Sequence, residues 1–294
     1  MFVILGAAGK VGRATIEILR GTGRSVRAVT RDRSKAAPLE AAGCEIAIAD
    51  LRDASSLAPA LAGASAVQVI CPTAPQAADA RAEMEQAITA IGLALAAARP
   101  PLVLAISDYG AELSAGTGIT TLFHALEKRL QRLPSETIFL RSAEHMENWQ
   151  RVAAIAMATG VLPSLHHPLT KLFPTISAPD LGRIAGGLLL SHRSGGPASR
   201  IVHAEGPRRY TPQDVAAAMT ALSGRDIVAH ALEREKWEAA LAAAGLRPSA
   251  IGLVTELYDA HNAGRIDAEA GAGEIRHGTT ELVDALRPLL PVTV

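Results

Sequence analysis

The feature that most constrains this chain lies at its start, where an apolar run stops at a glycine-rich turn and continues as a helical pattern. Residues 2–5 form the apolar run, and Gly6, Gly9 and Gly12 follow in the spacing G-x-x-G-x-x-G. A second apolar run, residues 26–29, leads into charged residues. The order of strand, glycine loop, helix and strand predicts a dinucleotide-binding βαβ unit, so a nicotinamide cofactor is the first functional hypothesis. A purely structural turn is the alternative.

Each glycine has a physical reason to be there. Gly6 allows a sharp turn off the strand, Gly9 allows the backbone to approach a pyrophosphate, and Gly12 allows the helix to pack closely on the sheet. The first N–H groups of the helix have no partner within it and would point at the phosphates. The predicted cofactor contacts in this loop are Gly6, Ala7, Ala8, Gly9, Lys10, Val11 and Gly12.

The end of the second strand bears on the choice between the two nicotinamide cofactors. NAD-binding proteins usually place an acidic residue there for the ribose hydroxyls. This chain has Arg31, whose guanidinium can hold a 2′-phosphate with a pair of charge-assisted hydrogen bonds. We therefore expect NADP(H) rather than NAD(H). Asp32 is the contrary observation, because its carboxylate is close enough in sequence to reach a ribose.

Short apolar runs and helical patterns continue to alternate after this unit, which predicts an α/β fold: a doubly wound parallel sheet of the Rossmann type with a smaller C-terminal α/β lobe. The expected strands are 45–49, 66–70, 102–106, 137–140 and 201–202. The expected helices are 34–43, 54–61, 77–98, 119–133, 143–158, 181–190 and one that starts after Thr211, with a turn at 194–197 and a loop over a cleft at 160–173. We expect residues 1–150, completed by 175–205, to form the cofactor domain, and 151–174 with 206–294 to form a substrate-binding lobe.

Composition excludes several classes of protein. Lys plus Arg equals Asp plus Glu, 29 of each, so no strong basic field favours nucleic acid or an anionic membrane surface. No apolar run is long enough to span a bilayer, and the first apolar run lacks the flanks of a signal peptide. The two cysteines, Cys44 and Cys71, suit buried thiols better than a metal cluster or a disulfide framework. We expect a cytoplasmic monomer or homodimer with no metal site.

Candidates for chemistry follow the strand that ends near residue 106. Ser107 stands where open α/β sheets place reacting groups, and Tyr109 follows two residues later. His124 and Lys128 lie one helical turn apart, in the spacing of the Tyr-x-x-x-Lys pair of short-chain dehydrogenases with His in place of Tyr. A neutral imidazole can exchange a proton near neutral pH, and a nearby lysine would tune it. The alternative is that both side chains lie on an exposed helix face.

The ordered set of motifs resembles the NmrA-like family of atypical short-chain dehydrogenases, over nearly the whole chain. The matching residues are Gly6-Ala7-Ala8-Gly9-Lys10-Val11-Gly12, Arg31, Asp50-Leu51, Ser107, Ile138-Phe139-Leu140-Arg141, His145-Met146-Glu147-Asn148, Lys236-Trp237-Glu238 and Leu257-Tyr258-Asp259-Ala260. The last two segments are similar to the tails of NADPH-dependent quinone reductases and triphenylmethane reductase. Related reductases often carry His four residues before the helix glutamate, whereas this chain has Phe123 there and His124 one place later.

The resemblance implies further site residues. Cofactor contacts are implied at Asp50, Leu51, Cys71, Pro72, Thr73, Ser107, Arg141 and Ser142, and substrate contacts at Tyr109, His145, Met146 and Phe173. The implied activity is NADPH-dependent hydride transfer to a quinone-like or conjugated small molecule in the cleft between domain and lobe. The alternative is a non-enzymatic NADP(H)-binding redox sensor that binds a protein partner. A sugar epimerase is disfavoured because the Tyr-x-x-x-Lys pair is missing.

Overall fold

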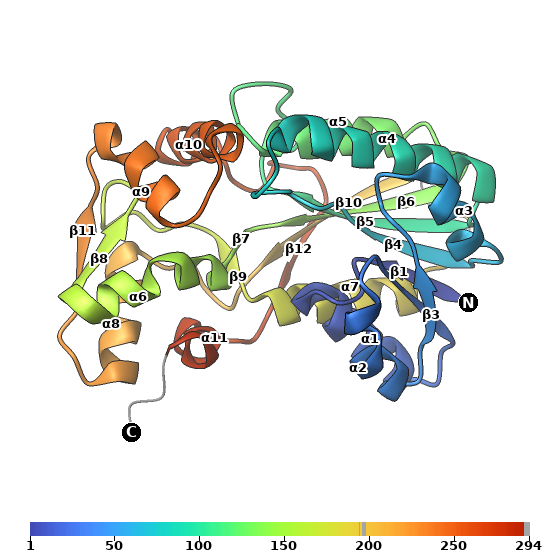
Figure 1. Cartoon of the computed structure of the whole chain (residues 1–294), viewed down its shortest axis with the longest axis horizontal. Helices are drawn as coiled ribbons and strands as arrows, with labels where there is room; N and C mark the ends of the chain where they lie inside the picture. The colour runs from blue at the N-terminus through green and yellow to red at the C-terminus, as the bar shows by residue number, and fades with distance from the viewer. Residues whose placement is uncertain (194, 196–197, 291–294) are drawn as a thin grey trace.

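The computed structural model describes residues 1–193, 195 and 198–290, and it has two parts (Figure 1). A wide parallel sheet with helices on both faces occupies the right of that view, and a smaller lobe lies at the left. The predicted turn at 194–197 falls mostly outside the described residues. None of the described helices is both long enough and apolar enough to cross a membrane.

The large sheet has eight strands in the order β12-β10-β6-β5-β4-β1-β2-β3, and every pair of neighbours is parallel. This is a doubly wound Rossmann order extended at one edge, with the reversal between β1 and β4, so the predicted fold class is confirmed. The strands are β1 Phe2–Leu5, β2 Val26–Thr30, β3 Glu45–Ile48, β4 Ala66–Ile70, β5 Leu102–Asp108, β6 Glu136–Ser142, β10 Ser199–Glu205 and β12 Glu274–His277.

Helices cover both faces of this sheet because alternate strand residues bury apolar side chains on opposite sides. One face packs against α3 Ala54–Leu61, α4 Ala80–Ala98 and α5 Thr120–Leu130, and the other against α1 Lys10–Gly21, α2 Ala37–Ala41 and α7 Ala178–Ser191. The neighbouring residues Val3 and Ile4 illustrate the alternation, since they belong to the two different core clusters. The predicted helix over 34–43 is shorter in the structure, because a 3₁₀ turn, η1 Arg33–Lys35, precedes α2.

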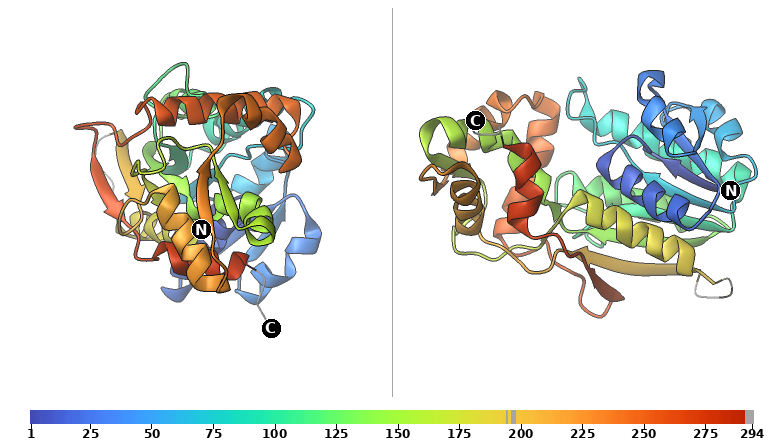
Figure 2. Two further views of the ribbon diagram at one scale, coloured as in Figure 1. Left: turned by 90° about the vertical axis from the view of Figure 1, so that its left-hand side faces the viewer. Right: turned by 90° about the horizontal axis from the view of Figure 1, so that it is seen from below.

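The helices α1 and α7 approach each other very closely, and they lie side by side under the sheet (Figure 2, right). Glycine makes this possible: a Cβ at Gly182 of α7 would stand 2.3 Å from the carbonyl oxygen of Val11 and 2.6 Å from the Cβ of Ala14. The Thr15 hydroxyl crosses the contact and donates to the carbonyl oxygens of Val11 and Gly182 at 3.1 and 3.0 Å. The helix that starts behind the glycine loop is therefore held by a second helix from far along the chain.

The lobe has its own small core. A parallel two-stranded sheet joins β8 Val161–Ser164 to β11 Val228–Ala231. The helices around it are α6 Gln150–Thr159, α8 Pro212–Ser223, α9 Trp237–Ala243, α10 Pro248–Asn262 and α11 Leu282–Leu286, with 3₁₀ turns η3 Arg234–Lys236 and η4 Arg287–Leu289. The predicted start of α8 is confirmed, since the Thr211 hydroxyl accepts from the Asp214 N–H at 3.1 Å and the Asp214 carboxylate accepts from the Thr211 N–H at 2.7 Å.

Two connections between the parts differ from the sequence prediction. The predicted helix over 143–158 starts later, because β7 Glu144–His145 pairs in parallel with β9 Thr175–Ile176 and a 3₁₀ turn, η2 Met146–Trp149, precedes α6. All of 206–294 was expected in the lobe, whereas β12 returns to the edge of the large sheet.

Candidate functional site

A cavity of about 590 Å³ lies at the carboxyl ends of the strands beside the glycine loop. Gly6, Ala8 and Gly9 line it, and α1 starts immediately behind them. A Cβ at Gly12 would stand 2.6 Å from the carbonyl oxygen of Gly6, so glycine is what allows the helix to begin against the loop. Among the described residues no side chain caps α1, which leaves the N–H groups of its first turn available to a phosphate. The predicted contacts that lie in the loop or first turn but off the cavity wall are Ala7, Lys10, Val11 and Gly12.

The far end of this cavity presents cations at its rim. Arg31, Asp32 and Lys35 all line it, and Lys35 is a cation that sequence reasoning missed. The Asp32 carboxylate caps η1, where it accepts hydrogen bonds from the N–H and hydroxyl of Ser34 at 2.9 and 2.6 Å. These bonds, the hydroxyl bond first, lower the pKa of Asp32. One oxygen of Asp32, the residue that favoured NAD, is therefore already hydrogen-bonded within the local turn, while Arg31 and Lys35 line the cavity.

Asp50 and Leu51, which were expected at the cofactor, line the same cavity. Arg52 lines it too and was not predicted. Its guanidinium donates to both oxygens of Asp50, at 3.1 and 2.8 Å, and to Glu83 at 2.9 Å. The hydrogen bond from Arg52 is the main cause of the lowered pKa of Asp50. This ion pair fixes the turn after β3 that forms one wall of the cavity. In the sequence, the only indication of the pair is an acidic residue two positions before an arginine.

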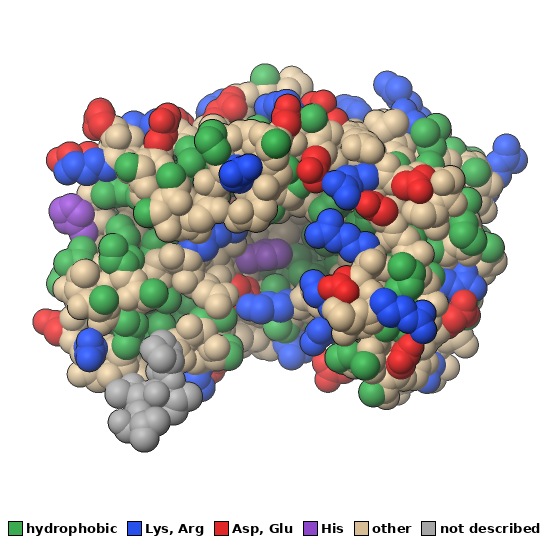
Figure 3. Space-filling view, in the orientation of Figure 1, with side chains coloured by type: hydrophobic (Ala, Val, Ile, Leu, Met, Phe, Trp, Pro, Cys, Tyr) green, Lys and Arg blue, Asp and Glu red, His purple; other side chains and the backbone are tan. Residues whose placement is uncertain are grey.

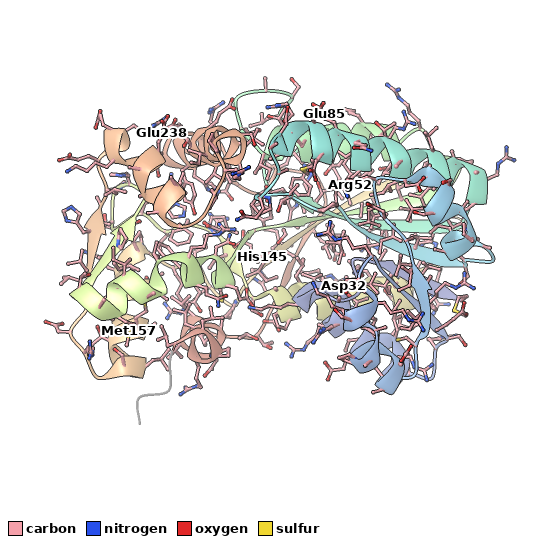
Figure 4. The ribbon with its side chains drawn as sticks, in the orientation of Figure 1. Asp32, Arg52, Glu85, His145, Met157 and Glu238 are labelled. Atoms are coloured by element: carbon pink, nitrogen blue, oxygen red, sulfur yellow. The ribbon has the colours of Figure 1, made fainter. Side chains whose placement is uncertain are left out.

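A second cavity of about 430 Å³ adjoins the first, and Pro72, Thr73 and Pro75 line both. It lies between the sheet and the lobe, at the hollow visible in the centre of Figure 3. In the same orientation, Figure 4 shows His145 on the lobe side of this hollow and Arg52 and Asp32 on the opposite side. The predicted contacts that line this cavity are Cys71, Pro72, Thr73, Ser107, Tyr109, Ser142 and His145.

Ser107 stands at the junction of this cavity with the end of β5, and its hydroxyl is fixed. It donates to Glu127 of α5 at 2.6 Å, and only 3% of the Glu127 side chain is exposed. The hydroxyl oxygen keeps its own lone pairs, so Ser107 can still accept a hydrogen bond from a group in the cavity. The sequence pattern did not predict this role of Glu127.

Arg141 was expected beside the nicotinamide, but its side chain lines neither cavity. Its guanidinium is 3% exposed and pairs with three carboxylates, of which Glu127 is buried and Glu112 and Glu269 are partly exposed. It donates twice to Glu127, at 2.9 Å each, and also to Glu112 at 3.0 Å and Glu269 at 2.5 Å. A buried cation needs this compensation. Arg141 therefore acts from behind the wall, where it holds the carboxylate that in turn holds Ser107.

The predicted catalytic pair, His124 and Lys128, also lies away from the cavity. The Nδ1 atom of His124 lies 2.8 Å from the carbonyl oxygen of Ala111, and Lys128 is exposed on the outer face of α5. Neither lines the cavity, whereas the neighbouring Phe123 does. One residue along a helix turns the side chain by about 100°, so the cavity wall receives the phenyl ring instead of the imidazole.

Two of the four expected substrate contacts, Met146 and Phe173, do not line the cavity. Met146 and Phe173 are buried in the core of the lobe, where the Phe173 ring stacks on His166 with centroids 4.0 Å apart. The segment expected as a loop over the cleft instead contributes β8 and buries Leu162, His166 and Phe173 in the lobe. Tyr109 is on the cavity wall but nearly fully buried, and its hydroxyl donates to Glu205 at 3.1 Å. His145 faces the cavity, and burial lowers its pKa.

The cavity wall also contains ionisable groups that sequence reasoning missed, namely Asp108, Glu144, Tyr258 and His261. Glu144 accepts from His166 at 2.8 Å and from the hydroxyl of Tyr258 at 2.7 Å. Burial raises the pKa of Glu144, but His166, His261 and Tyr258 together outweigh burial and lower this pKa to about 2. Burial lowers the pKa of His261 to about 4. The lobe side of the cavity therefore holds a fixed negative charge beside neutral aromatic groups.

Comparison with known proteins agrees with this geometry. Residues 6–134 match the family model described as NAD(P)H-binding. An NAD(P)H azoreductase of Xenophilus azovorans is 26% identical over 259 residues, which cover 88% of this chain and 86% of that protein.

Two solved structures share the fold over almost their full length. The Escherichia coli NADPH-dependent quinone oxidoreductase complexed with NADPH has a TM-score of 0.79 at 22% identity, covering 98% of this chain and 99% of that one. The Citrobacter sp. triphenylmethane reductase complexed with NADP(H) has a TM-score of 0.80 at 19% identity, covering 99% and 100%. At such identities the solved structures show the fold alone, and the match to the NAD(P)H-binding family model covers residues 6–134.

Proposed function

We propose that this protein is an NADPH-dependent reductase that transfers a hydride to a quinone-like or otherwise conjugated small molecule. The observation that carries the proposal is the pair of adjoining cavities. One runs past an uncapped helix N-terminus to basic side chains, and the other continues from it, past Ser107, into a space lined largely by apolar side chains. A dinucleotide laid along the first would bring its ring to the second.

The residues present fit the cofactor. The first turn of α1 would hold the pyrophosphate, and Arg31 and Lys35 would hold a 2′-phosphate. Bound there, the nicotinamide supplies the hydride. Ser107, held by Glu127, would orient a polar group at the junction of the cavities, and Phe123 would help to exclude water from the acceptor side. The three similar proteins, an azoreductase, a quinone oxidoreductase and a triphenylmethane reductase, act on conjugated acceptors by name.

The test is NADPH consumption by the purified protein with a panel of quinones, azo dyes and cationic triphenylmethane dyes, with NADH run in parallel. We expect saturable consumption that is faster with NADPH. Tight NADPH binding in calorimetry without consumption for any acceptor would refute the reductase and favour a redox sensor. A preference for NADH would refute the assignment of the 2′-phosphate site.

A further inference from the structure

We propose that Asp108 is the proton donor to the reduced acceptor, an inference that rests on the proposed reductase function. Asp108 is the last residue of β5, directly after Ser107, and it lies on the wall of the smaller cavity. The sequence gives no reason to single it out from its neighbours. Its place next to the junction of the two cavities makes it the carboxyl group nearest in sequence to the residue expected beside the nicotinamide.

The hydrogen bonds to Asp108 fix the orientation of its carboxyl group. Oδ2 accepts from the hydroxyl of Thr120 at 2.5 Å, and the backbone of Tyr109 makes a further hydrogen bond to the carboxyl group. Among the described residues, no side chain donates to Oδ1. A carboxyl group that carries its proton on this oxygen can donate it into the cavity, while the Thr120 bond fixes the orientation of the group.

The surroundings keep the proton on Asp108. Burial, followed at a distance by the charges of Glu144 and Glu112, raises the pKa of Asp108 to about 7 even though the Thr120 bond opposes the rise. The other titratable or charged side chains around the cavity are Tyr109 of the β5–α5 connection, His145 of β7, Arg151 of α6, and Tyr258 and His261 of α10. Burial lowers the pKa of both histidines and raises the pKa of both tyrosines. Near neutral pH these imidazoles are unprotonated and the phenols hold their protons strongly, which leaves Asp108 as the acid best matched to the task.

Two electrons and one hydrogen enter a quinone or an azo group as a hydride, which leaves an oxygen or nitrogen anion on the acceptor. The O–H bond of Asp108 breaks, a new O–H or N–H bond forms on the acceptor, and Asp108 becomes a carboxylate. Solvent water returns the proton after the product leaves. A cationic triphenylmethane dye needs no such step, because the hydride alone converts it to the neutral leuco form.

This difference between acceptors supplies a sharp experiment on the full-length protein with NADPH. Asp108→Asn should lower kcat for a quinone or azo dye by about 100-fold and lower kcat for a cationic dye far less. In the parent protein, kcat for the quinone should fall as the pH rises through about 7, and Asp108→Asn should lack this fall. Thr120→Val removes the bond that favours the carboxylate, so it should move the fall to higher pH. Asp108→Glu should recover part of the lost rate.

The cofactor-free protein offers an independent readout. An infrared difference spectrum between pH 5 and pH 9 should contain a protonated carboxyl band that titrates near neutral pH and is missing in Asp108→Asn. Equal losses with both kinds of acceptor would assign Asp108 a structural role and overturn the proposal, as would an unchanged pH profile or a carboxyl ionised well below neutral pH. If the parent protein reduces no acceptor, the reductase function itself fails, and the proton-donor role fails with it.

Discussion

The close contact between α1 and α7 makes a strong prediction for Gly182→Ala. A Cβ there would stand 2.3 Å from the carbonyl oxygen of Val11, 2.6 Å from the Cβ of Ala14 and 3.1 Å from the amide nitrogen of Thr15. Two of these neighbours are backbone atoms, which cannot rotate away, so the helices must move apart. A gap of about 0.5–1 Å forfeits about a quarter to a half of the dispersion attraction across a contact. Overpacking of this kind costs about 1–3 kcal/mol of folding free energy.

A second glycine of the same helix is the matched control. Gly187 is exposed, and within the described part of the chain no atom lies within 4 Å of a Cβ built on it. Gly187→Ala should therefore stabilise the protein by about 1 kcal/mol through helix propensity alone. The same propensity gain accompanies Gly182→Ala, so the difference between the two variants isolates the steric cost, and we expect it to be about 1–3 kcal/mol.

The assay is urea unfolding followed by far-ultraviolet circular dichroism, because both tryptophans, Trp149 and Trp237, lie in the lobe and report less directly on α7. NADPH affinity should also fall in Gly182→Ala and not in Gly187→Ala, since Val11 belongs to the first turn of the helix expected to hold the pyrophosphate. Equal stability of the two variants, or a more stable Gly182→Ala, would show that the helices yield without cost and refute the argument.

Four further predictions follow from single side chains. Arg31→Ala should weaken NADPH binding by about 1.5–3 kcal/mol in calorimetry and leave NADH binding nearly unchanged, whereas Arg33→Ala, which lies off the cavity, should affect neither. Arg141→Ala should destabilise the fold by about 3–5 kcal/mol in urea unfolding, because it leaves the buried carboxylate of Glu127 uncompensated; a loss below about 1 kcal/mol would contradict the buried ion pair. Thr211→Ala should cost about 1 kcal/mol through the lost cap of α8, measured as a lower urea midpoint, and an unchanged midpoint would speak against the capping box. Because its pKa is raised, Asp108 binds its proton more tightly in the folded state than in the unfolded state, and the stability that this group contributes is lost as the pH rises from about 4 to about 7. Relative to the parent protein, Asp108→Asn should gain stability over that range and keep the gain at higher pH. A difference in unfolding free energy between the two proteins that stays constant from pH 4 to pH 8 would contradict the shift.

Local sequence was sufficient to predict most of the fold and several residues that line the first cavity. The apolar runs match the central strands of the large sheet because these strands are buried on both faces, whereas the exposed edge strand β12 has no such run and was not predicted. The glycine loop is recognisable because its geometry admits few other residues. The helix predicted over 143–158 was wrong at its start. The spacing of Ala143, Met146 and Trp149 is helical. Glu144 and His145 nevertheless form a strand, because they pair with a strand thirty-one residues later.

The acceptor side of the site was harder to predict for the same reason. Arg141 has a neighbour in sequence that does face the cavity, Ser142, and only the tertiary structure reveals that the arginine is occupied by three carboxylates from other segments. Asp108 is one acid among many until burial raises its pKa. Such properties belong to contacts between distant segments, which periodicity and spacing cannot report.

The return of β12 to the large sheet has a consequence for how such a protein can change over evolutionary time. The chain passes between sheet and lobe after β6, before α7, after β10, before β12 and again before α11. No single cut releases the lobe, so it cannot be exchanged as a terminal module without removing strands of the sheet. A change in the ligand preference of the second cavity must therefore come from substitutions on its wall or from insertions in the loops of the lobe. The segments that cross between the two parts keep the sheet and the lobe together in such changes.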